Sequence, residues 1–348
     1  MEQVTTVEPR RDLNLVGLEK TDYRGGNTTL CQGCGHNSIS SQIIQVCYEL
    51  SIQPEKILKF SGIGCSSKSP AYFLNRSFGF NGLHGRMPPL ATGAMLADHT
   101  LRGIGISGDG DSVSIGMGHF KHVLRRNLPL VYIIENNGVY GLTKGQFSAT
   151  AEKGLRLKSQ GTNPYMPIDI CWEALVGNAT FIARSFAGDP KQVRELLKAA
   201  LSHHGVAVLD IISPCVTFNN SDEAMHSYGW GKEHEVAIHE LSYVPPAEEI
   251  LVEYVEGESK EVIMHDGSVV VLKKLSREHD PSDRAAAMRI LEDANSNQEL
   301  LTGLIYIRTD QPALDEIYNL PEQPLNRLTD ESLRPDPETL AWLNGLMF

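Results

Sequence analysis

Short, continuous apolar runs separated by helix-like segments constrain this fold more than any other feature of the sequence. Two of these runs, Leu128–Glu135 (LPLVYIIE) and Val206–Ile212 (VAVLDII), are typical of strands that are buried on both faces. Between them, Asp189-Pro190 opens an amphipathic segment that we expect to be a helix ending at Gly205. Buried strands that alternate with helices form a parallel sheet covered by helices. The sequence therefore predicts an open α/β fold with a parallel sheet.

The character of the sequence divides the chain into three parts. Residues 1–30 are expected to be an irregular N-terminal arm, and residues 31–235 an α/β domain. Residues 236–348 are expected to form a C-terminal extension. It would contain a small hairpin around His265-Asp266-Gly267, a short helix at Ser282–Ala294, and a Pro-rich tail that either wraps a partner subunit or is partly disordered.

The composition is that of an ordinary globular protein. The 348 residues are 41% hydrophobic and 21% charged, and the formal net charge is -12. Such a negative charge argues against a surface that binds DNA or RNA. No stretch approaches the roughly 20 apolar residues that cross a bilayer, and the N-terminal segment has acidic residues and no apolar run. We therefore expect a cytoplasmic protein without a membrane or nucleic-acid partner.

One strand-to-helix turn combines glycines with acidic side chains. Gly108-Asp109-Gly110-Asp111 follows a predicted strand at Gly103–Ser107 and precedes a predicted helix at Ser112–Asn127. In open parallel sheets, ligands bind at the carboxyl ends of the strands. There the free N–H groups of a helix N-terminus bind phosphate, and a carboxylate such as that of Asp109 is a ligand that Mg²⁺ prefers. The turn predicts a phosphate and magnesium site, although GDG alone also occurs as a tight turn without a ligand.

A second polar segment is expected at the same edge of the sheet. Asn136-Asn137 directly follows the predicted strand Leu128–Glu135. Gly138–Gly141 (GVYG) continues as a turn whose carbonyl groups can add a metal ligand. GDG followed by this Asn pair resembles the thiamine-diphosphate motif of pyruvate decarboxylase-like and transketolase-like enzymes. That resemblance implies that Asp109, Asn137 and the carbonyl group of Val139 hold Mg²⁺.

The six cysteines indicate metal or redox chemistry rather than a disulfide framework. Cys31-Gln32-Gly33-Cys34 is a C-x-x-C loop that suits half of a zinc knuckle, a redox dithiol or two ligands of an iron–sulfur cluster. The zinc interpretation is weakened because the sequence has no second C-x-x-C or H-x₃-H pair. The dithiol interpretation is weakened because the loop follows an irregular arm instead of a strand.

The other cysteines fall into two groups. Cys47 and Cys171 lie in helix-like segments and are expected to be small buried side chains. Cys65, in a Gly-rich turn after a predicted strand, and Cys215, after Ser213-Pro214, are expected at the edge of the sheet that carries the GDG turn. These two residues and the C-x-x-C pair could bind one 4Fe–4S cluster, which spacing alone does not decide.

Six sequence blocks resemble the β, thiamine-binding, subunit of the 2-oxoacid:ferredoxin oxidoreductases, and in particular the 2-oxoglutarate group. The blocks are LCQGCGH (30–36), GIGCSSK (62–68), HGRMPPLATGA (84–94), GDGD (108–111), NNGVYGLTKGQ (136–146) and PCVTFN (214–219). They occur in the family's order, and no block covers the residues after about 235. The resemblance implies a thiamine diphosphate-binding fold.

The resemblance also implies roles for individual residues. The four cluster ligands would be Cys31, Cys34, Cys65 and Cys215. Lys68 and Leu142 would lie near the substrate, and Arg86 near the cofactor. Thiamine diphosphate would contact Ile63, Gly64, Cys65, Ser66, His84, Gly108, Asp109, Gly110, Asp111, Asn137, Val139, Tyr140, Gly141, Leu142 and Thr143.

By the same resemblance, the enzyme would convert 2-oxoglutarate and CoA to succinyl-CoA and CO₂, or catalyse the reverse carboxylation. Electrons would pass from thiamine diphosphate through the cluster to ferredoxin. A lysine at the position of Lys68 favours substrates with a distal carboxylate; a pyruvate or broad-range enzyme is the alternative. Two-subunit members carry the carboxylate that activates the cofactor on the α subunit, so we expect activity only in a heterodimer or a dimer of heterodimers. A non-oxidative thiamine enzyme and a zinc-stabilised binding subunit are more distant alternatives.

Overall fold

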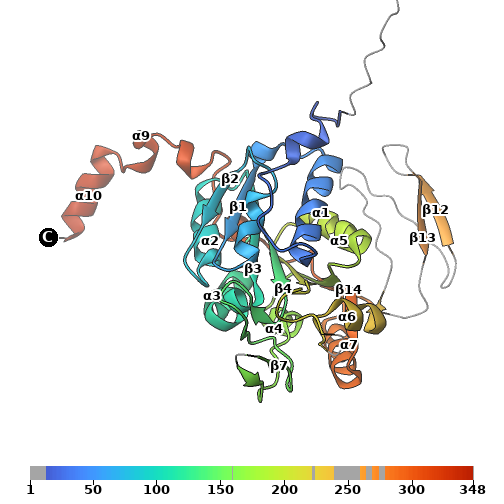
Figure 1. Ribbon diagram of the computed structural model, residues 1–348. Helices are drawn as coiled ribbons and strands as arrows, with labels where there is room; N and C mark the ends of the chain where they lie inside the picture. Colours follow the sequence, from blue (N-terminus) through green and yellow to red (C-terminus); the bar gives the residue numbers. More distant parts are fainter. Residues whose placement is uncertain are drawn as a thin grey trace, which may run out of the picture.

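The structure, a computed structural model, is built around one large sheet (Figure 1). It describes residues 13–158, 160–221, 224–238 and 279–347, and the backbone alone of 259–263 and 269–273. Among these residues the sheet has eight strands, in the spatial order β11 (Glu235–Ala237), β14 (Leu300–Ile307), β9 (Phe181–Phe186), β10 (Ala207–Ile212), β4 (Leu130–Asn136), β3 (Arg102–Gly108), β1 (Ile57–Ser61) and β2 (Phe78–Asn81). Neighbouring strands are parallel, except that β14 runs antiparallel to β9. The predicted open α/β fold is confirmed.

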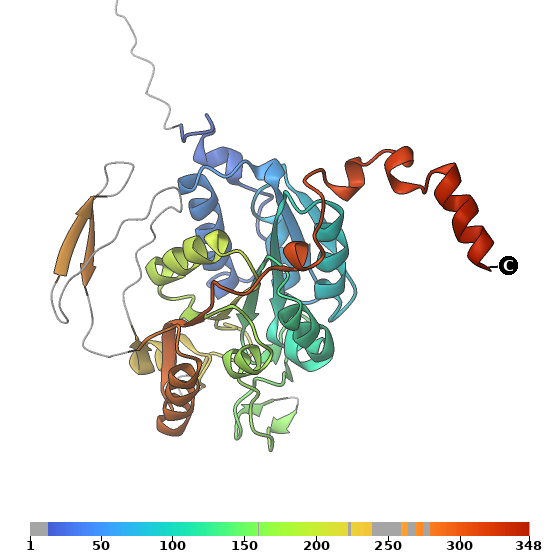
Figure 2. The same cartoon turned by 180° about the vertical axis from the view of Figure 1, so that it is seen from behind.

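Helices cover both faces of the sheet (Figures 1 and 2). Helices α1 (Gly35–Glu49) and α5 (Pro190–Ser202) share one apolar core with the sheet, to which Ile43, Leu196 and Ile106 contribute. The opposite core is formed with α2 (Met87–Ala97), α3 (Met117–Arg125), α4 (Ile170–Val176) and α7 (Arg284–Asn297). The molecule therefore has three layers, and the sheet is buried on both faces as its apolar strands require.

The remaining elements are short. They are η1 (Lys20–Tyr23), η2 (Pro54–Lys56), η3 (Ser66–Ala71), the π-helical turn η4 (Gly110–Ile115), β5 (Val139–Tyr140), β6 (Gln146–Phe147), β7 (Arg156–Leu157), β8 (Gly161–Thr162), α6 (Tyr228–His234), β12 (Ser259–Ile263), β13 (Val269–Lys273), α8 (Leu314–Ile317), η5 (Leu325–Arg327), α9 (Asp330–Leu333) and α10 (Pro337–Met347). No helix in the described part of the chain is long and apolar enough to cross a membrane.

Helix α5 shows how local sequence sets an element. Asp189 is its N-cap, and the carboxylate of Asp189 accepts a hydrogen bond from the backbone N–H of Gln192 at 3.1 Å. Pro190 occupies the first turn, where its missing N–H is not needed. The predicted start is confirmed, but the helix ends at Ser202, before the expected Gly205.

The helix expected at Ser112–Asn127 is divided. The chain leaves β3 in the π-helical turn η4, and α3 begins only at Met117. Gly116 separates the two elements, and a methyl group at this position would lie 2.5 Å from the carbonyl oxygen of Asp111. This tight passage brings the GDGD turn close to the loop that contains Gly85, which lies against Gly116.

The structure shows how the two ends of the chain join the central sheet. β14 belongs to the main sheet, so residue 235 does not separate the sheet from a C-terminal extension. The N-terminal arm is packed on the body, because Tyr23 is fully buried and the backbone N–H of Gly25 donates to the carbonyl of Tyr72 at 3.0 Å. Its first twelve residues lie outside the described part.

The small hairpin and the short helix were predicted correctly. Strands β12 and β13 pair antiparallel, with Ser259 opposite Lys273 and Ile263 opposite Val269. The predicted turn at His265-Asp266-Gly267 lies outside the described residues. The helix expected at Ser282–Ala294 is α7. Beyond it, α9 and α10 extend away from the body of the molecule (Figures 1 and 2).

Candidate active site

The GDGD turn lies at the carboxyl end of β3, as expected, and its first carboxylate is held by buried donors. Asp109 is only 1% exposed. Its Oδ2 accepts hydrogen bonds from the hydroxyl groups of Thr150, at 2.7 Å, and Ser148. Its Oδ1 accepts one from the backbone N–H of Asn137 at 3.3 Å. The Asp109 carboxylate therefore has a fixed orientation beside the Asn pair.

Asp109 and Asn137 fit a magnesium site by their chemistry. They offer a carboxylate and a carboxamide oxygen from neighbouring strand ends, which are the hard oxygen ligands that Mg²⁺ prefers. The Asn137 Oδ1 accepts a hydrogen bond from the backbone N–H of Val139 at 3.1 Å, and the carbonyl of Asn137 accepts one from Asn219 at 3.0 Å. The loop that follows β4 is thereby held against the GDGD turn.

Asp111 connects three loops. Its Oδ1 accepts hydrogen bonds from the backbone N–H groups of Gly85, at 2.6 Å, and Ile63, at 3.3 Å. The same carboxylate contacts His84 Nδ1 and the hydroxyl group of Ser107. Because its oxygens are occupied by protein donors, Asp111 fixes the shape of the cavity wall.

Tyr140 closes the cavity on the other side. Its hydroxyl group donates to the carbonyl of Gly110 at 3.1 Å. A methyl group at Gly110 would lie 2.5 Å from the Tyr140 ring, so a side chain at this position has no room. The glycine of the turn is required by this close approach of the two loops.

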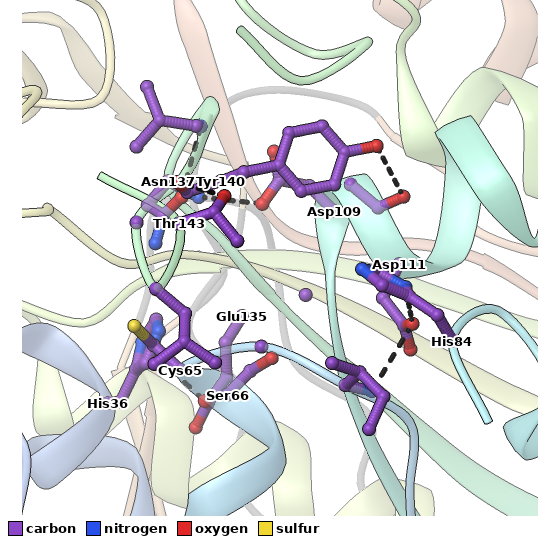
Figure 3. A pocket seen from close by; sticks show the side chains of 17 residues that line it. His36, Cys65, Ser66, His84, Asp109, Asp111, Glu135, Asn137, Tyr140 and Thr143 are labelled. Carbon is purple, nitrogen blue, oxygen red and sulfur yellow. Dashed lines mark hydrogen bonds and ion pairs between the residues drawn. The ribbon is translucent and has the colours of Figure 1, made fainter. Parts of the chain in front are cut away.

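One cavity brings the predicted cofactor residues together (Figure 3). All of the residues expected to contact thiamine diphosphate line it, and so do His36 and Glu135. Lys68 and Arg86 are not part of the lining. Lys68 lies in η3, and its backbone N–H donates to the carbonyl of Cys65 at 3.1 Å. The role of each lining residue stays a prediction.

Four cysteines gather beside this cavity. A methyl group at Gly141 would lie 3.6 Å from the sulfurs of both Cys65 and Cys215. Cys31 lies next to the Cys215 loop, because the hydroxyl group of Thr217 donates to its sulfur at 3.7 Å. Cys31 is exposed, and Cys34, Cys65 and Cys215 are half-buried. Cys47 and Cys171 are buried elsewhere, as predicted.

The electrostatics of the thiols reflects their proximity. Burial, with smaller contributions from Glu135, Cys215 and Cys65, raises the pKa of Cys34 to about 12. Burial also raises the pKa of Cys65, with Cys215 as the next cause. Thiols in such a group release their protons when they bind a metal. In the described ranges, no three His, Cys, Asp or Glu side chains converge on a single metal ion.

Sequence reasoning missed a buried acid beside the cavity. Glu135 is completely buried, and burial raises its pKa well above the ordinary value. Its only signal in the sequence is that it is the charged residue of an apolar run. His36 was interpreted as structural, which agrees with its burial, and burial lowers its pKa to about 4. Ser148 and Thr150, the donors to Asp109, gave no signal.

Comparisons with known proteins agree with this site. Residues 62–211 match the family model described as "Thiamine pyrophosphate enzyme, C-terminal TPP binding domain". The chain is 43% identical over 192 residues to the "2-oxoacid:ferredoxin oxidoreductase subunit beta" of Saccharolobus solfataricus, covering 55% of this chain and 63% of that protein. It is 36% identical over 192 residues to the "2-oxoglutarate synthase subunit KorB" of Methanocaldococcus jannaschii, covering 54% of this chain and 69% of that protein.

A solved structure resembles nearly the whole chain. It is described as "2-oxoglutarate:ferredoxin oxidoreductase from Magnetococcus marinus with 2-oxoglutarate, coenzyme A and succinyl-CoA bound". The TM-score is 0.74 at 30% sequence identity, covering 97% of this chain and 99% of that chain. The chain belongs to the β-subunit family of the 2-oxoacid:ferredoxin oxidoreductases. The sequence-based resemblance is confirmed, and the thiamine-binding domain of this β subunit contains most of the cavity lining. The chain spans less than two thirds of the Saccharolobus protein, at 63%.

Proposed function

We propose that this β subunit takes part in the CoA-dependent oxidative decarboxylation of 2-oxoglutarate to succinyl-CoA and CO₂, or in the reverse carboxylation. Thiamine diphosphate and Mg²⁺ would occupy the cavity, a 4Fe–4S cluster would bind to the four grouped cysteines, and ferredoxin would exchange the electrons. One observation carries the proposal: Cys65 lines the cofactor cavity and also lies beside Cys215. Thiamine diphosphate, as the electron donor, and the 4Fe–4S cluster would therefore be neighbours.

Two groups of residues would bind the two cofactors. Asp109, Asn137 and the carbonyl of Val139 would hold Mg²⁺ and, through it, the diphosphate. Cys31, Cys34, Cys65 and Cys215 would ligate the cluster. Bound thiamine diphosphate supplies the decarboxylation chemistry, and the cluster accepts electrons one at a time. The protein would contribute the placement of the two groups on neighbouring loops.

A partner subunit is part of the proposal. Of the carboxylates that line the cavity, Asp109 is assigned to Mg²⁺ and Asp111 accepts backbone hydrogen bonds from two other loops. The third, Glu135, accepts hydrogen bonds from Ser69. None is free to activate the cofactor, so an α subunit would supply that carboxylate. Exposed apolar side chains near the cavity suit such a contact: Ile63, Leu83, Ile115 and Leu142 are 38% to 78% exposed.

The choice of 2-oxoglutarate rests on Lys68. This lysine follows Cys65 by one turn of η3, and its positive charge lowers the pKa of the Cys65 thiol. A lysine so close to the cavity can pair with the distal carboxylate of the substrate when the α subunit covers the site. We infer that Lys68 and Leu142 form the substrate-facing side of the pocket.

The proposal is tested on protein produced and purified without oxygen, together with its α subunit. We expect a brown complex that contains iron and thiamine diphosphate and that reduces ferredoxin with 2-oxoglutarate and CoA. Cys215→Ala is expected to remove the colour, and the matched variant Cys171→Ala to retain it. A colourless complex containing zinc would contradict the proposal, and equal turnover of pyruvate would limit it to a broad-range enzyme.

A further inference from the structure

Four buried polar side chains form a network behind the cavity. Glu135, at the carboxyl end of β4, lies at its centre and is 0% exposed. The hydroxyl group of Ser69 donates to the Glu135 carboxylate, with its two oxygens at 3.0 and 3.1 Å. His36 Nδ1 lies 3.5 Å from Glu135 Oε2 and 2.5 Å from Ser213 Oγ. Figure 3 shows His36, Cys65 and Glu135 at the same end of the cavity.

The other three side chains of the network belong to segments that carry cysteines, and Ser213 joins the network through His36. His36 follows Cys34 by two residues at the start of α1. Ser69 lies in η3, whose N-cap is Cys65. Ser213 precedes Cys215 by two residues, after the end of β10. Glu135 belongs to none of these segments, and its strand is paired on both sides in the middle of the sheet.

The network has little freedom to rearrange. A methyl group at Gly35 would lie 2.5 Å from Ser213 Oγ and 3.1 Å from the Ala187 Cβ, so the C-x-x-C loop packs directly on the Cys215 segment. His36, Ser69 and Ser213 are all buried, and a buried polar group that loses its partner costs far more than an exposed one. Loss of Glu135 would therefore leave the Ser69 hydroxyl group without its acceptor. It would also leave His36, the partner of Ser213, without its contact with the carboxylate.

We infer that Glu135 is a positioning residue that holds the three cysteine-bearing segments in the cluster-binding arrangement before a cluster binds. This inference rests on the proposed function and adds to it. The network consists of protein side chains alone: Ser69 donates to Glu135, and His36 lies against the same carboxylate and pairs with Ser213. The arrangement of the segments therefore does not depend on iron. Loops that are ordered in advance do not have to lose their conformational entropy when the cluster is inserted.

The first measurement uses the full chain, free of iron and with reduced thiols. Dibromobimane, a short reagent that links two thiols, is added, and the Cys65–Cys215 product is followed by peptide mass spectrometry. Two sulfurs that are held close together react at a high effective concentration. We expect Glu135→Leu and Ser69→Ala to slow this reaction about tenfold. Glu135→Gln, which keeps polar atoms at the same positions, is expected to react within about twofold of the wild type.

Ser40→Ala is the matched control, because Ser40 is a buried serine of α1 whose hydroxyl group has no hydrogen-bond partner. It is expected to react like the wild type. If Glu135→Leu does not fold, the cross-linking rates of Ser69→Ala and Ser40→Ala are compared instead, and they test the inference. Wild-type rates in Ser69→Ala and Glu135→Leu, or an equal loss in Ser40→Ala, would overturn the inference.

A second measurement separates this inference from the proposed function. The iron bound by the wild-type chain is determined after anaerobic reconstitution with iron and sulfide. A wild type without a cluster would refute the proposed function, whatever the cross-linking shows. A wild type with a cluster, combined with unchanged cross-linking and iron content in Glu135→Leu, would refute only the positioning role. We expect Glu135→Leu to bind less iron and Glu135→Gln to restore it.

Discussion

Asp109 and Asp111 lie two positions apart in the chain, and their carboxylates have different partners. Asp111 accepts backbone hydrogen bonds from Ile63 and Gly85, so it joins loops to one another. Asp109 is oriented towards Asn137 by Ser148 and Thr150. At the scale of single residues, Asp111 shapes the cavity, and we propose that Asp109 binds Mg²⁺.

Asp109→Ala is expected to weaken binding of thiamine diphosphate with Mg²⁺ by at least about 100-fold, because it removes a direct metal ligand. Isothermal titration calorimetry of the purified chain measures this loss. Asp283→Ala, which removes the N-cap of α7 far from the cavity, is the control. It should cost about 1 kcal/mol of folding free energy and leave cofactor affinity unchanged. Unchanged affinity in Asp109→Ala would refute the magnesium assignment.

Lys68→Ala is expected to raise the KM for 2-oxoglutarate much more than the KM for pyruvate, by about tenfold or more, because only 2-oxoglutarate has a distal carboxylate. Steady-state assays of the complex with its α subunit measure both constants. Lys153→Ala, an exposed lysine outside the segments that carry the cysteines and the cavity lining, serves as the control. Equal effects on the two substrates would contradict the role of Lys68.

Much of the cavity could be predicted at this scale. The ends of parallel strands meet at one edge, so Cys65, Asp109 and Asn137 could be placed together from strand order alone. The partners of buried groups could not be predicted in this way. Ser69 and Glu135 are far apart in the sequence, and their hydrogen bond follows from the three-dimensional packing of η3 against β4.

At the scale of elements, close approach between loops decides which residues are tolerated. The turn after β3 packs on β5, where Gly110 faces the Tyr140 ring. Sequence pattern predicted β3, β4, β10 and α5 but not β9. It also missed the division of η4 from α3, because that division depends on the contact of Gly116 with Gly85.

Gly110→Ala is expected to lower the free energy of unfolding by about 1–3 kcal/mol, because the new methyl group overlaps the Tyr140 ring. Urea unfolding measures the change. Gly93→Ala is the matched control, since a methyl group at this exposed position of α2 meets nothing within 4 Å. It should stabilise the chain by about 0.5–1 kcal/mol. A neutral Gly110→Ala would show that the two loops are not in fixed contact.

At the scale of the molecule, the sheet extends into the C-terminal part of the chain. β14 pairs with β9, which lies more than a hundred residues earlier in the sequence. No change in composition along the chain indicates this pairing. The expected boundary at residue 235 relied on a change of character, which does not report strand pairing. By contrast, α10 has exposed Leu340, Trp342 and Leu346 and makes no part of either core.

We propose that this tail binds the α subunit. Deletion of residues 329–348 is expected to change the free energy of unfolding of the chain by less than about 0.5 kcal/mol, because the side chains of α9 and α10 are exposed. The affinity for the α subunit should fall by about tenfold or more, since exposed apolar side chains contribute most when a partner buries them. Urea unfolding measures the first quantity, and analytical ultracentrifugation measures the second. Unchanged assembly would contradict this role.

The most direct test of the account is whether substrate reduces a cluster beside the cofactor cavity. The anaerobic complex is mixed with 2-oxoglutarate and CoA without ferredoxin, and its visible absorption and electron paramagnetic resonance are followed. We predict bleaching and the signal of a reduced 4Fe–4S cluster, with about four iron atoms per β subunit. Both should be absent in Cys65→Ala and retained in Cys47→Ala. A complex that turns over 2-oxoglutarate with no iron present would contradict the account.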